Sequence, residues 1–279
     1  MLKLVLRRLP SALLTMIALP VVAGEYFRSS TGRAYGITLA TKLRILAQMI
    51  RNNVRIQSGS NFISHLLMAG RIMNVPPETA GVLVECGCFK GGSTANLSLV
   101  AAACGRKLHA FDSFAGLPSP EGDDVGHVIL ADLEVRTYEE GGYAGTLDEV
   151  RENIRRYGAL DVCEFHVGYF EQTMPEFEEP VIFAYVDVDL TKSEETCLRE
   201  LWPLLAEGSA LFTDEAHHLE IAGLFYDRQW WQQELGTSPP GLVGAGNGIG
   251  LFLHEGGFRS GLGYTVKMPP AERLSHRPG

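Results

Sequence analysis

The stretch Val82-Leu83-Val84-Glu85-Cys86-Gly87-Cys88-Phe89-Lys90-Gly91-Gly92-Ser93-Thr94 decides the fold of this chain. Its first half is an apolar run that predicts a strand, and its glycines predict a turn that leads into a helix. In an open α/β sheet, ligands bind outside the carboxyl ends of the strands, where a glycine turn brings backbone close to the ligand and the next helix offers free N–H groups. We therefore expect a ligand site directly after Glu85.

A carboxylate precedes the first glycine of this turn, which distinguishes it from the dinucleotide fingerprint G-x-G-x-x-G. A fixed negative charge here repels a diphosphate but attracts a cationic ligand such as S-adenosylmethionine. The next predicted strand, Lys107 to Phe111, leads to Asp112. This acid follows Gly91 at roughly the 20-residue distance at which an acidic residue meets a ribose in such folds. Two interpretations remain open, a cofactor site and a glycine-rich turn that binds nothing.

Carboxylates also follow two later strands of the predicted sheet. Asp187 and Asp189 come after the continuous apolar run Val181 to Val186, which is typical of a central parallel strand, and Asp214-Glu215 come after the next strand in sequence. These acids are expected at one end of the sheet, where their mutual repulsion would be relieved by a divalent cation with oxygen ligands. The alternative is that they cap helices or lie in solvated loop ends.

Composition and charge are those of a globular protein with an unusual N-terminal segment. The chain has 279 residues, 46% of them hydrophobic and 20% charged, and five scattered cysteines that suggest reduced thiols in a cytosolic protein. Its net charge of −9 favours no nucleic-acid partner. The first 77 residues contain ten Lys or Arg and one acid, whereas the remainder is strongly acidic. This asymmetry predicts an N-terminal arm that meets an acidic surface.

Residues 1–77 are expected to form a basic helical extension. The apolar run Ser11 to Gly24 is shorter than the ~20 residues of a membrane span, so a packed helix, an interfacial anchor and a signal peptide or single span all remain open. Thr38 to Ile56 predicts a basic amphipathic helix that either covers a core stripe or binds a membrane surface, and Asn61 to Met73 predicts a further helix.

The connection between residues 119 and 145 is acidic, rich in glycine and long, which is typical of a lid, a binding loop or a disordered segment. Further predicted elements follow it: helices at Thr146–Tyr157, at Ser193–Leu205 with Gly208 as its cap, and at Leu219–Leu235 with an aromatic face; strands at Val162–Val167, Ser209–Phe212, Ile249–His254 and Tyr264–Met268; and a glycine-rich connection at Gly241–Gly250.

Five motifs in this order resemble those of the macrocin-type O-methyltransferases, which use S-adenosylmethionine and Mg²⁺ to methylate sugar hydroxyls: VECGCFKGGST, HAFDSFAGLP, VGYFEQTMP, YVDVDLTKSEET and GSALFTDEAHH. The resemblance covers roughly Thr79 to Leu253. It implies an α/β, Rossmann-like class I methyltransferase fold, with a mostly parallel seven-stranded sheet and helices on both faces. In this scheme residues 78–268 form the methyltransferase domain, residues 119–145 its lid and residues 269–279 a mobile tail.

The resemblance also implies roles for individual residues. Glu85 and Gly87 would lie at the methionine end of the cofactor and Asp112 at the ribose. Further cofactor-binding candidates are Gly91, Ser93, Thr94, Ser113, Gly168, Tyr169 and Phe170. The metal ligands would be Asp187, Asp214 and Glu215. Two positions depart from the family, which usually has an aromatic residue in place of Thr191 and a second aspartate in place of Glu215.

Methyl transfer needs an oxygen nucleophile in line with the sulfonium, and Mg²⁺ chelated by vicinal hydroxyls both fixes that line and lowers the hydroxyl pKa. We take Asp187 as a catalytic metal ligand, and Asp189, His217 and His218 as candidates for the base that removes the proton. Taken individually, each histidine fits an ordinary loop residue better than a base.

These observations predict an S-adenosylmethionine- and Mg²⁺-dependent O-methyltransferase that acts on a hydroxyl of a sugar or glycosylated metabolite. We expect a cytoplasmic homo-oligomer, with peripheral membrane contact through the basic arm as a further hypothesis. The alternatives are a non-catalytic membrane-surface protein that retains the fold and an NAD(P)-dependent dehydrogenase, against which the carboxylate before Gly87 argues.

Overall fold

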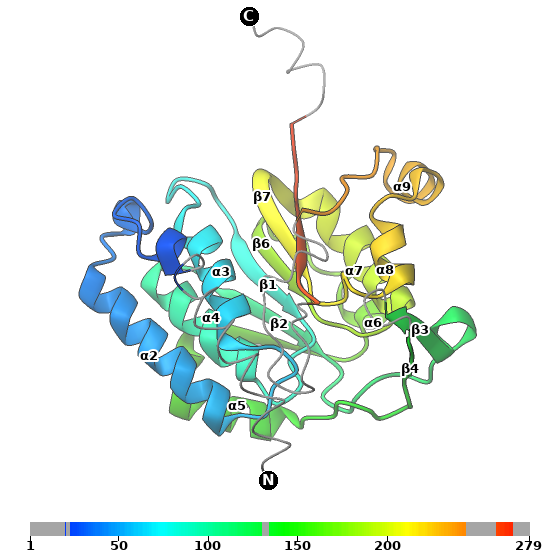
Figure 1. Ribbon diagram of the computed structural model, residues 1–279, viewed down its shortest axis with the longest axis horizontal. Coiled ribbons are helices and arrows are strands. Elements are labelled where there is room, and N and C mark those ends of the chain that lie inside the picture. The colour runs from blue at the N-terminus through cyan, green and yellow to red at the C-terminus, as the bar shows by residue number, and fades with distance from the viewer. Residues whose placement is uncertain (1–19, 21–22, 130–133, 244–260, 270–279) are drawn as a thin grey trace, which may run out of the picture.

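A six-stranded sheet forms the centre of the protein (Figure 1). The computed structural model describes residue 20 and residues 23–129, 134–243 and 261–269. The strand order is β5-β2-β1-β6-β7-β8; the first five strands are parallel and β8 is antiparallel to β7. The bounds are β1 Val82–Cys86, β2 Leu108–Asp112, β5 Cys163–Val167, β6 Val181–Val186, β7 Leu205–Thr213 and β8 Gly263–Val266.

Helices cover both faces of the sheet, as predicted. Figure 1 shows α2 to α5 on one side and α6 to α9 on the other. Their bounds are α2 Leu39–Arg55, α3 Phe62–Met73, α4 Gly92–Ala103, α5 Leu147–Tyr157, α6 Phe170–Thr173, α7 Thr191–Leu204, α8 Leu219–Leu224 and α9 Arg228–Leu235, with short 3-10 turns at Arg33–Tyr35, Gly122–Val125 and Leu160–Val162. The α/β fold with a mostly parallel sheet is therefore confirmed, with six of the seven predicted strands in the described residues and the seventh, predicted at 249–254, outside them.

The two predicted helices of the N-terminal extension begin at side-chain caps. Thr38 accepts a hydrogen bond from the backbone N–H of Thr41 at the start of α2, and Asn61 caps α3 in the same way. Ile45 and Met49 of α2 belong to the same buried cluster as the sheet residue Leu83. The described part of the extension is thus packed into the helical layer that covers one face of the sheet.

Strand β6 has the bounds that its apolar run predicts, and all six of its residues are buried. It lies between β1 and β7 in the middle of the sheet, and the helices on both sides of the sheet cover its two faces. A central strand of this kind can be predicted from the sequence because all of its residues are apolar, without the alternation of polar and apolar residues that a half-exposed strand shows.

Two predicted helix boundaries were wrong. The segment Leu219–Leu235 forms two helices, because the side chain of Asp227 accepts the N–H groups of Gln229 and Trp230 and so begins α9 anew. Gly208 does not cap α7, which ends at Leu204 and passes directly into β7. Gly208 lies inside this strand with φ +82°, at the irregularity where β7 shifts register against β6.

The long connection after β2 contains regular structure and is neither a bare loop nor disordered throughout. It forms an antiparallel hairpin of β3 (Gly126–Ile129) and β4 (Glu134–Thr137), and β3 contacts α8. Most of the apolar run at 11–24, the predicted strand at 249–254 and all but the first residue of the 269–279 tail lie outside the described residues. Within the described ranges, no helix is long and apolar enough to cross a membrane.

Candidate active site

A cavity of about 850 Å³ opens at the carboxyl ends of the central strands. Its walls come from the turns after β1, β2, β6 and β7, from the segment Gln57 to Gly59 between α2 and α3, and from the β3–β4 hairpin. The site therefore combines the edge of the sheet and the connection that was predicted as a lid with one segment, Gln57 to Gly59, that the sequence analysis did not assign to it.

The turn after β1 is held against the end of β6. Gly87 has φ +87°, and a Cβ atom there would lie 1.8 Å from the carbonyl oxygen of Asp187. Only glycine combines this left-handed backbone with such a close approach. The glycine turn and the first carboxylate after β6 consequently have their positions fixed relative to each other.

Asp112 holds the other side of this turn. Its Oδ2 accepts the backbone N–H of Cys88 at 2.6 Å and of Phe89 at 3.3 Å, and its Oδ1 accepts that of Phe114 at 2.7 Å. Burial raises the pKa of Asp112 in spite of these bonds. Its carboxylate lines the cavity and at the same time shapes the loop that a cofactor would contact.

The predicted cofactor-binding residues are divided between the wall and the layer behind it. Glu85 is fully buried on β1 and its side chain does not line the cavity; burial raises its pKa to about 8. The predicted residues that line the cavity are Gly87, Ser93, Asp112, Ser113, Tyr169 and Phe170, and those that do not are Glu85, Gly91, Thr94 and Gly168. Gly91 instead begins α4 with φ +80°.

The three predicted metal ligands lie together in the cavity. One carboxylate oxygen from each of Asp187, Asp214 and Glu215 lies within 4.8 Å of the others, a grouping that no other three acids, histidines or cysteines make in the described ranges. Burial raises the pKa of all three, and repulsion from Asp187 raises those of Asp214 and Glu215 further. Three buried carboxylates this close together fit a hard divalent cation with oxygen ligands, and the longer Glu215 reaches this cluster too.

Asp189 also lines the cavity, in a strained conformation. Burial and then the charge of Asp187 raise its pKa to about 7. Among described non-glycine residues, positive φ occurs at Phe89, Phe114, Tyr143 and Asp189; three of these line the cavity and Phe114 follows a lining residue. Such strain persists where surrounding structure imposes it, and it is concentrated at functional sites.

His217 and His218 lie on the wall beside the carboxylates. Burial, and then Arg136, lowers the pKa of His217 to about 4, and burial lowers that of His218 to about 2. The Nε2 atom of His218 lies 3.2 Å from the hydroxyl of Tyr138, which comes from the long connection. Both imidazoles are therefore neutral at pH 7, and both are weak bases.

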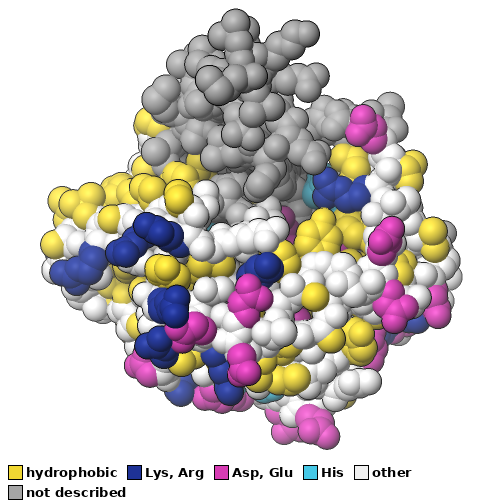
Figure 2. Space-filling view, turned by 90° about the horizontal axis from the view of Figure 1, so that it is seen from below, with side chains coloured by type: hydrophobic (Ala, Val, Ile, Leu, Met, Phe, Trp, Pro, Cys, Tyr) yellow, Lys and Arg dark blue, Asp and Glu magenta, His cyan; other side chains and the backbone are white. Residues whose placement is uncertain are grey.

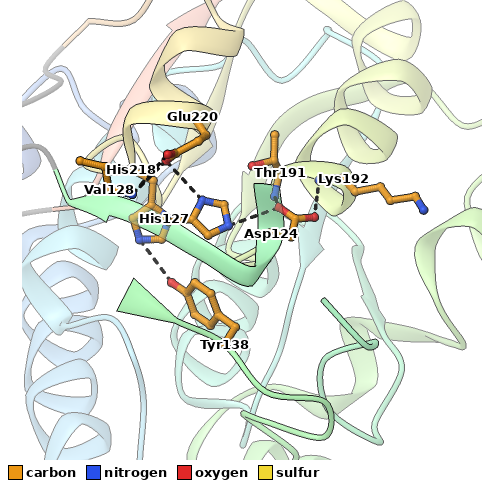
Figure 3. A network of polar contacts seen from close by, with 8 residues as sticks. All are labelled: Asp124, His127, Val128, Tyr138, Thr191, Lys192, His218 and Glu220. Atoms are coloured by element: carbon orange, nitrogen blue, oxygen red, sulfur yellow. Dashed lines mark hydrogen bonds and ion pairs between the residues drawn. The ribbon is translucent and has the colours of Figure 1, made fainter. Parts of the chain in front are cut away.

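A buried polar network fixes the hairpin beside the cavity (Figure 3). His127 of β3 lies between two acids, with Nε2 3.2 Å from Asp124 and Nδ1 3.5 Å from Glu220 of α8. Asp124 also accepts the backbone N–H groups of Thr191 at 2.7 Å and Lys192 at 3.2 Å, at the start of α7. The hairpin is thereby attached to α7 and α8, the helices that follow β6 and β7.

Several lining residues were missed by the sequence analysis: Gln57, Ser58, Gly59, Lys90, Glu134, Arg136 and Tyr143. Gln57 to Gly59 precede a predicted helix and carry no local signal for a site. Arg136 belongs to the connection that was predicted as a lid, and its placement on a cavity wall depends on the hairpin.

Comparison with known proteins agrees with this geometry. A family model described as Macrocin-O-methyltransferase (TylF) matches residues 64–231. The 8-demethyl-8-(2,3-dimethoxy-alpha-L-rhamnosyl)-tetracenomycin-C 4'-O-methyltransferase of Streptomyces olivaceus is 35% identical over 141 residues, which are 48% of this chain and 52% of that protein. The match thus spans about half the length of this curated relative.

Two solved structures share the fold. The O-methyltransferase NovP has a TM-score of 0.56 at 20% identity, with 93% of this chain and 100% of that one covered. The calicheamicin methyltransferase CalS11 has a TM-score of 0.51 at 18% identity, with 90% and 91% covered. At these identities the likeness shows the architecture alone.

Proposed function

Because the chain belongs to the macrocin-O-methyltransferase family, we propose that it transfers the methyl group of S-adenosylmethionine to a hydroxyl of a sugar or glycosylated metabolite. The observation that carries this proposal is the placement of a glycine turn and a three-carboxylate cluster in one cavity. The rhamnosyl compound in the name of the Streptomyces olivaceus relative supports a glycosylated acceptor.

The turn after β1 would bind the methionine and ribose parts of the cofactor. Asp112 keeps the backbone of Cys88 and Phe89 in place, and Gly87 lets the turn approach the end of β6. Glu85 would support this turn from behind the wall without contacting the cofactor, since its side chain does not reach the cavity surface. A positioned sulfonium needs only an oxygen in line with its methyl group.

Asp187, Asp214 and Glu215 would hold a Mg²⁺ ion. Bound there, Mg²⁺ would orient vicinal hydroxyls of the acceptor and lower their pKa. In the transfer the acceptor oxygen bonds to the methyl carbon, the carbon–sulfur bond breaks, and the hydroxyl proton leaves to a base.

We propose Asp189 as that base. Its carboxylate lines the cavity and has a pKa of about 7, whereas the lowered pKa values of His217 and His218 make both imidazoles poor proton acceptors near neutrality. His217, a candidate from the sequence, would then contact the acceptor as a neutral hydrogen-bonding group. Arg136 and Tyr143 would bind the acceptor from the hairpin side.

Calorimetry with S-adenosylmethionine, followed by a mass-spectrometric screen of glycosylated acceptors for a methyl addition, tests the function. The proposal requires binding and a methylated product. Absence of cofactor binding by the intact protein would refute it, and NAD binding in its place would favour the dehydrogenase alternative. Cofactor binding without turnover on any hydroxyl acceptor, together with liposome binding, would favour a non-catalytic membrane-surface protein.

Helix α2 supports a proposal about assembly. Leu39, Leu43, Ile50 and Val54 are 61%, 51%, 44% and 80% exposed and follow one another at helical spacing. Figure 2 shows hydrophobic and Lys or Arg side chains together on the side of the molecule where α2 lies. We propose that this face docks onto the acidic part of a second copy of the chain, with an anionic membrane as the alternative. We also propose that the protein resides in the cytoplasm, where its five free cysteines stay reduced.

A double variant, Leu43→Asp with Val54→Asp, distinguishes docking between copies from attachment to a membrane. Docking between copies requires the variant to elute later from a sizing column than the wild type. Membrane attachment requires an unchanged size and a loss of salt-sensitive binding to anionic liposomes. Val167→Asp, at a residue 54% exposed on the edge strand β5, is the matched control and should change neither property.

A further inference from the structure

Two histidines on neighbouring strands form a pair on the face of the sheet that α6 covers, outside the cavity. Nδ1 of His109 on β2 lies 3.0 Å from Nε2 of His166 on β5. His109 is 2% exposed, and its Nε2 lies 3.3 Å from Oε1 of Glu179 and 4.0 Å from Oε2 of Glu164. His166 also stacks on Phe111, with ring centroids 4.0 Å apart. The pair therefore joins β5 to β2 by a side-chain contact in addition to the backbone ladder.

The contact between the two rings has room for one proton. A carboxylate accepts and does not donate at neutral pH, so the Nε2 proton of His109 is directed at Glu179 and its Nδ1 is an acceptor. His166 then donates from Nε2. If one ring takes up a proton, the other can still present a lone pair by changing its tautomer. If both rings are protonated, two N–H groups face each other and the hydrogen bond is lost.

The surroundings keep both rings neutral near pH 7. Burial lowers the pKa of His109 and of His166, and the neighbouring His109 lowers the pKa of His166 further. The charged groups that face the pair, among the residues that the structure describes, are Glu179 and Glu164, which favour protonation, and Lys107, which opposes it and lies 3.1 Å from Glu164. Because the pKa values are lower in the folded than in the unfolded protein, the contact is complete above about pH 6.5 and is weakened as the pH falls below it.

The edge strand that takes part in this pair leads directly into the cavity wall. Val167 of β5 is the register partner of Asp112 on β2, and the N–H of Gly168 donates to the carbonyl oxygen of Asp112 at 3.0 Å. Tyr169 and Phe170, which come next, line the cavity. In the described sheet β2 is the one neighbour of β5. A displacement of β5 would therefore move Tyr169 and Phe170 relative to Asp112, which holds the turn after β1.

We propose that His109 and His166 are positioning residues of the cofactor-binding wall, and that double protonation of the pair weakens S-adenosylmethionine binding. The inference rests on the proposed role of Asp112, Tyr169 and Phe170 in cofactor binding. In the neutral state the shared hydrogen bond keeps β5 against β2. In acid the two charged rings repel each other, β5 is held less tightly, and the wall loses its fixed position. A pair that only filled space would affect binding equally at every pH.

His166→Gln tests the pair directly, because a glutamine amide can donate to Nδ1 of His109 or accept from it, and it does not titrate. Calorimetric titration of the full-length proteins with S-adenosylmethionine gives the ratio of the affinity of the variant to that of the wild type. Between about pH 8 and about pH 5 this ratio should rise about 5-fold, which corresponds to the loss of one net hydrogen bond of about 1 kcal/mol in the wild type. His109→Gln should show the same rise, since removal of either ring prevents double protonation, and the double variant should show no larger one.

His65→Gln is the matched control. His65 is a buried histidine of α3 whose ring contacts Ser60 and Asn96, and burial lowers its pKa to about 3, so it does not titrate in this range. Its affinity ratio should stay constant with pH. A constant ratio for His166→Gln and His109→Gln as well would overturn the inference while leaving cofactor binding intact.

Hydrogen exchange of the backbone amides of β5 gives a second measurement, which needs no ligand. Compared with His166→Gln, the wild type should exchange about 5-fold faster at about pH 5 and at the same rate at about pH 8, with β6 as an unchanged internal reference. A wild type that binds no S-adenosylmethionine would refute the proposed function, and exchange alone would then decide on the histidine pair. Equal exchange of β5 in the two proteins at both pH values would overturn the inference.

Discussion

Substitution of Gly87 by alanine should damage the fold and the proposed metal site together, since this residue joins the glycine turn after β1 to the end of β6. The new Cβ would lie 1.8 Å from the carbonyl oxygen of Asp187, and relief of the clash to 3.0 Å requires a displacement of about 1.2 Å. The left-handed φ of +87° adds a conformational cost of roughly 1–2 kcal/mol for a residue with a side chain. Overpacking adds about 1–3 kcal/mol more.

Gly105→Ala separates these two costs. Gly105 has φ +62°, but nothing lies within 4 Å of an added Cβ, so this variant bears only the backbone cost. Urea unfolding should show a loss of roughly 1–2 kcal/mol in Gly105→Ala. The loss in Gly87→Ala should be about 2–5 kcal/mol, the sum of the backbone and overpacking terms.

Binding measurements complete the prediction. A displacement of about 1 Å at Asp187 is enough to lower a rate about 100-fold, so Gly87→Ala should lose Mg²⁺ affinity and turnover while Gly105→Ala keeps both. Equal stability losses in the two variants would refute the steric argument. Wild-type cation binding by Gly87→Ala would refute the coupling of the turn to the carboxylate cluster.

Four further changes test other parts of the site. Chelation of divalent cations should abolish turnover, and Asp214→Asn should reduce turnover far more than S-adenosylmethionine affinity; activity after thorough chelation would contradict the metal assignment. Glu85 has its pKa raised from 4.5 to about 8 by burial, so the wild type should lose stability as the pH rises through this interval. Glu85→Gln should not show this loss. The difference in the free energy of unfolding between Glu85→Gln and the wild type, measured in urea, should therefore grow between pH 5 and pH 9 by something on the order of 4 kcal/mol. A difference that stays constant with pH would argue against the buried acid. His127→Phe should increase hydrogen exchange in β3 and β4 and raise the acceptor KM at unchanged cofactor affinity, whereas unaltered exchange would show that the polar network does not hold the hairpin.

The sequence by itself determined the central strands, the glycine turn and the helix starts. Val181 to Val186 are apolar without alternation, because a strand covered on both faces needs no polar side. Thr38 and Asn61 mark helix starts because a cap is an interaction between residues two or three positions apart. The grouping of Asp187, Asp214 and Glu215 was also predictable, since parallel neighbouring strands end at the same edge of a sheet.

Only the tertiary structure decided which side chains reach the cavity. Glu85 follows the strand pattern of a ligand-binding acid, yet it is fully buried behind the cavity wall. Asp124 and His127 belong to a connection without periodicity, and their partners on α7 and α8 lie more than 60 residues away. Contacts over such separations depend on the packing of whole elements, so local periodicity and spacing do not encode them.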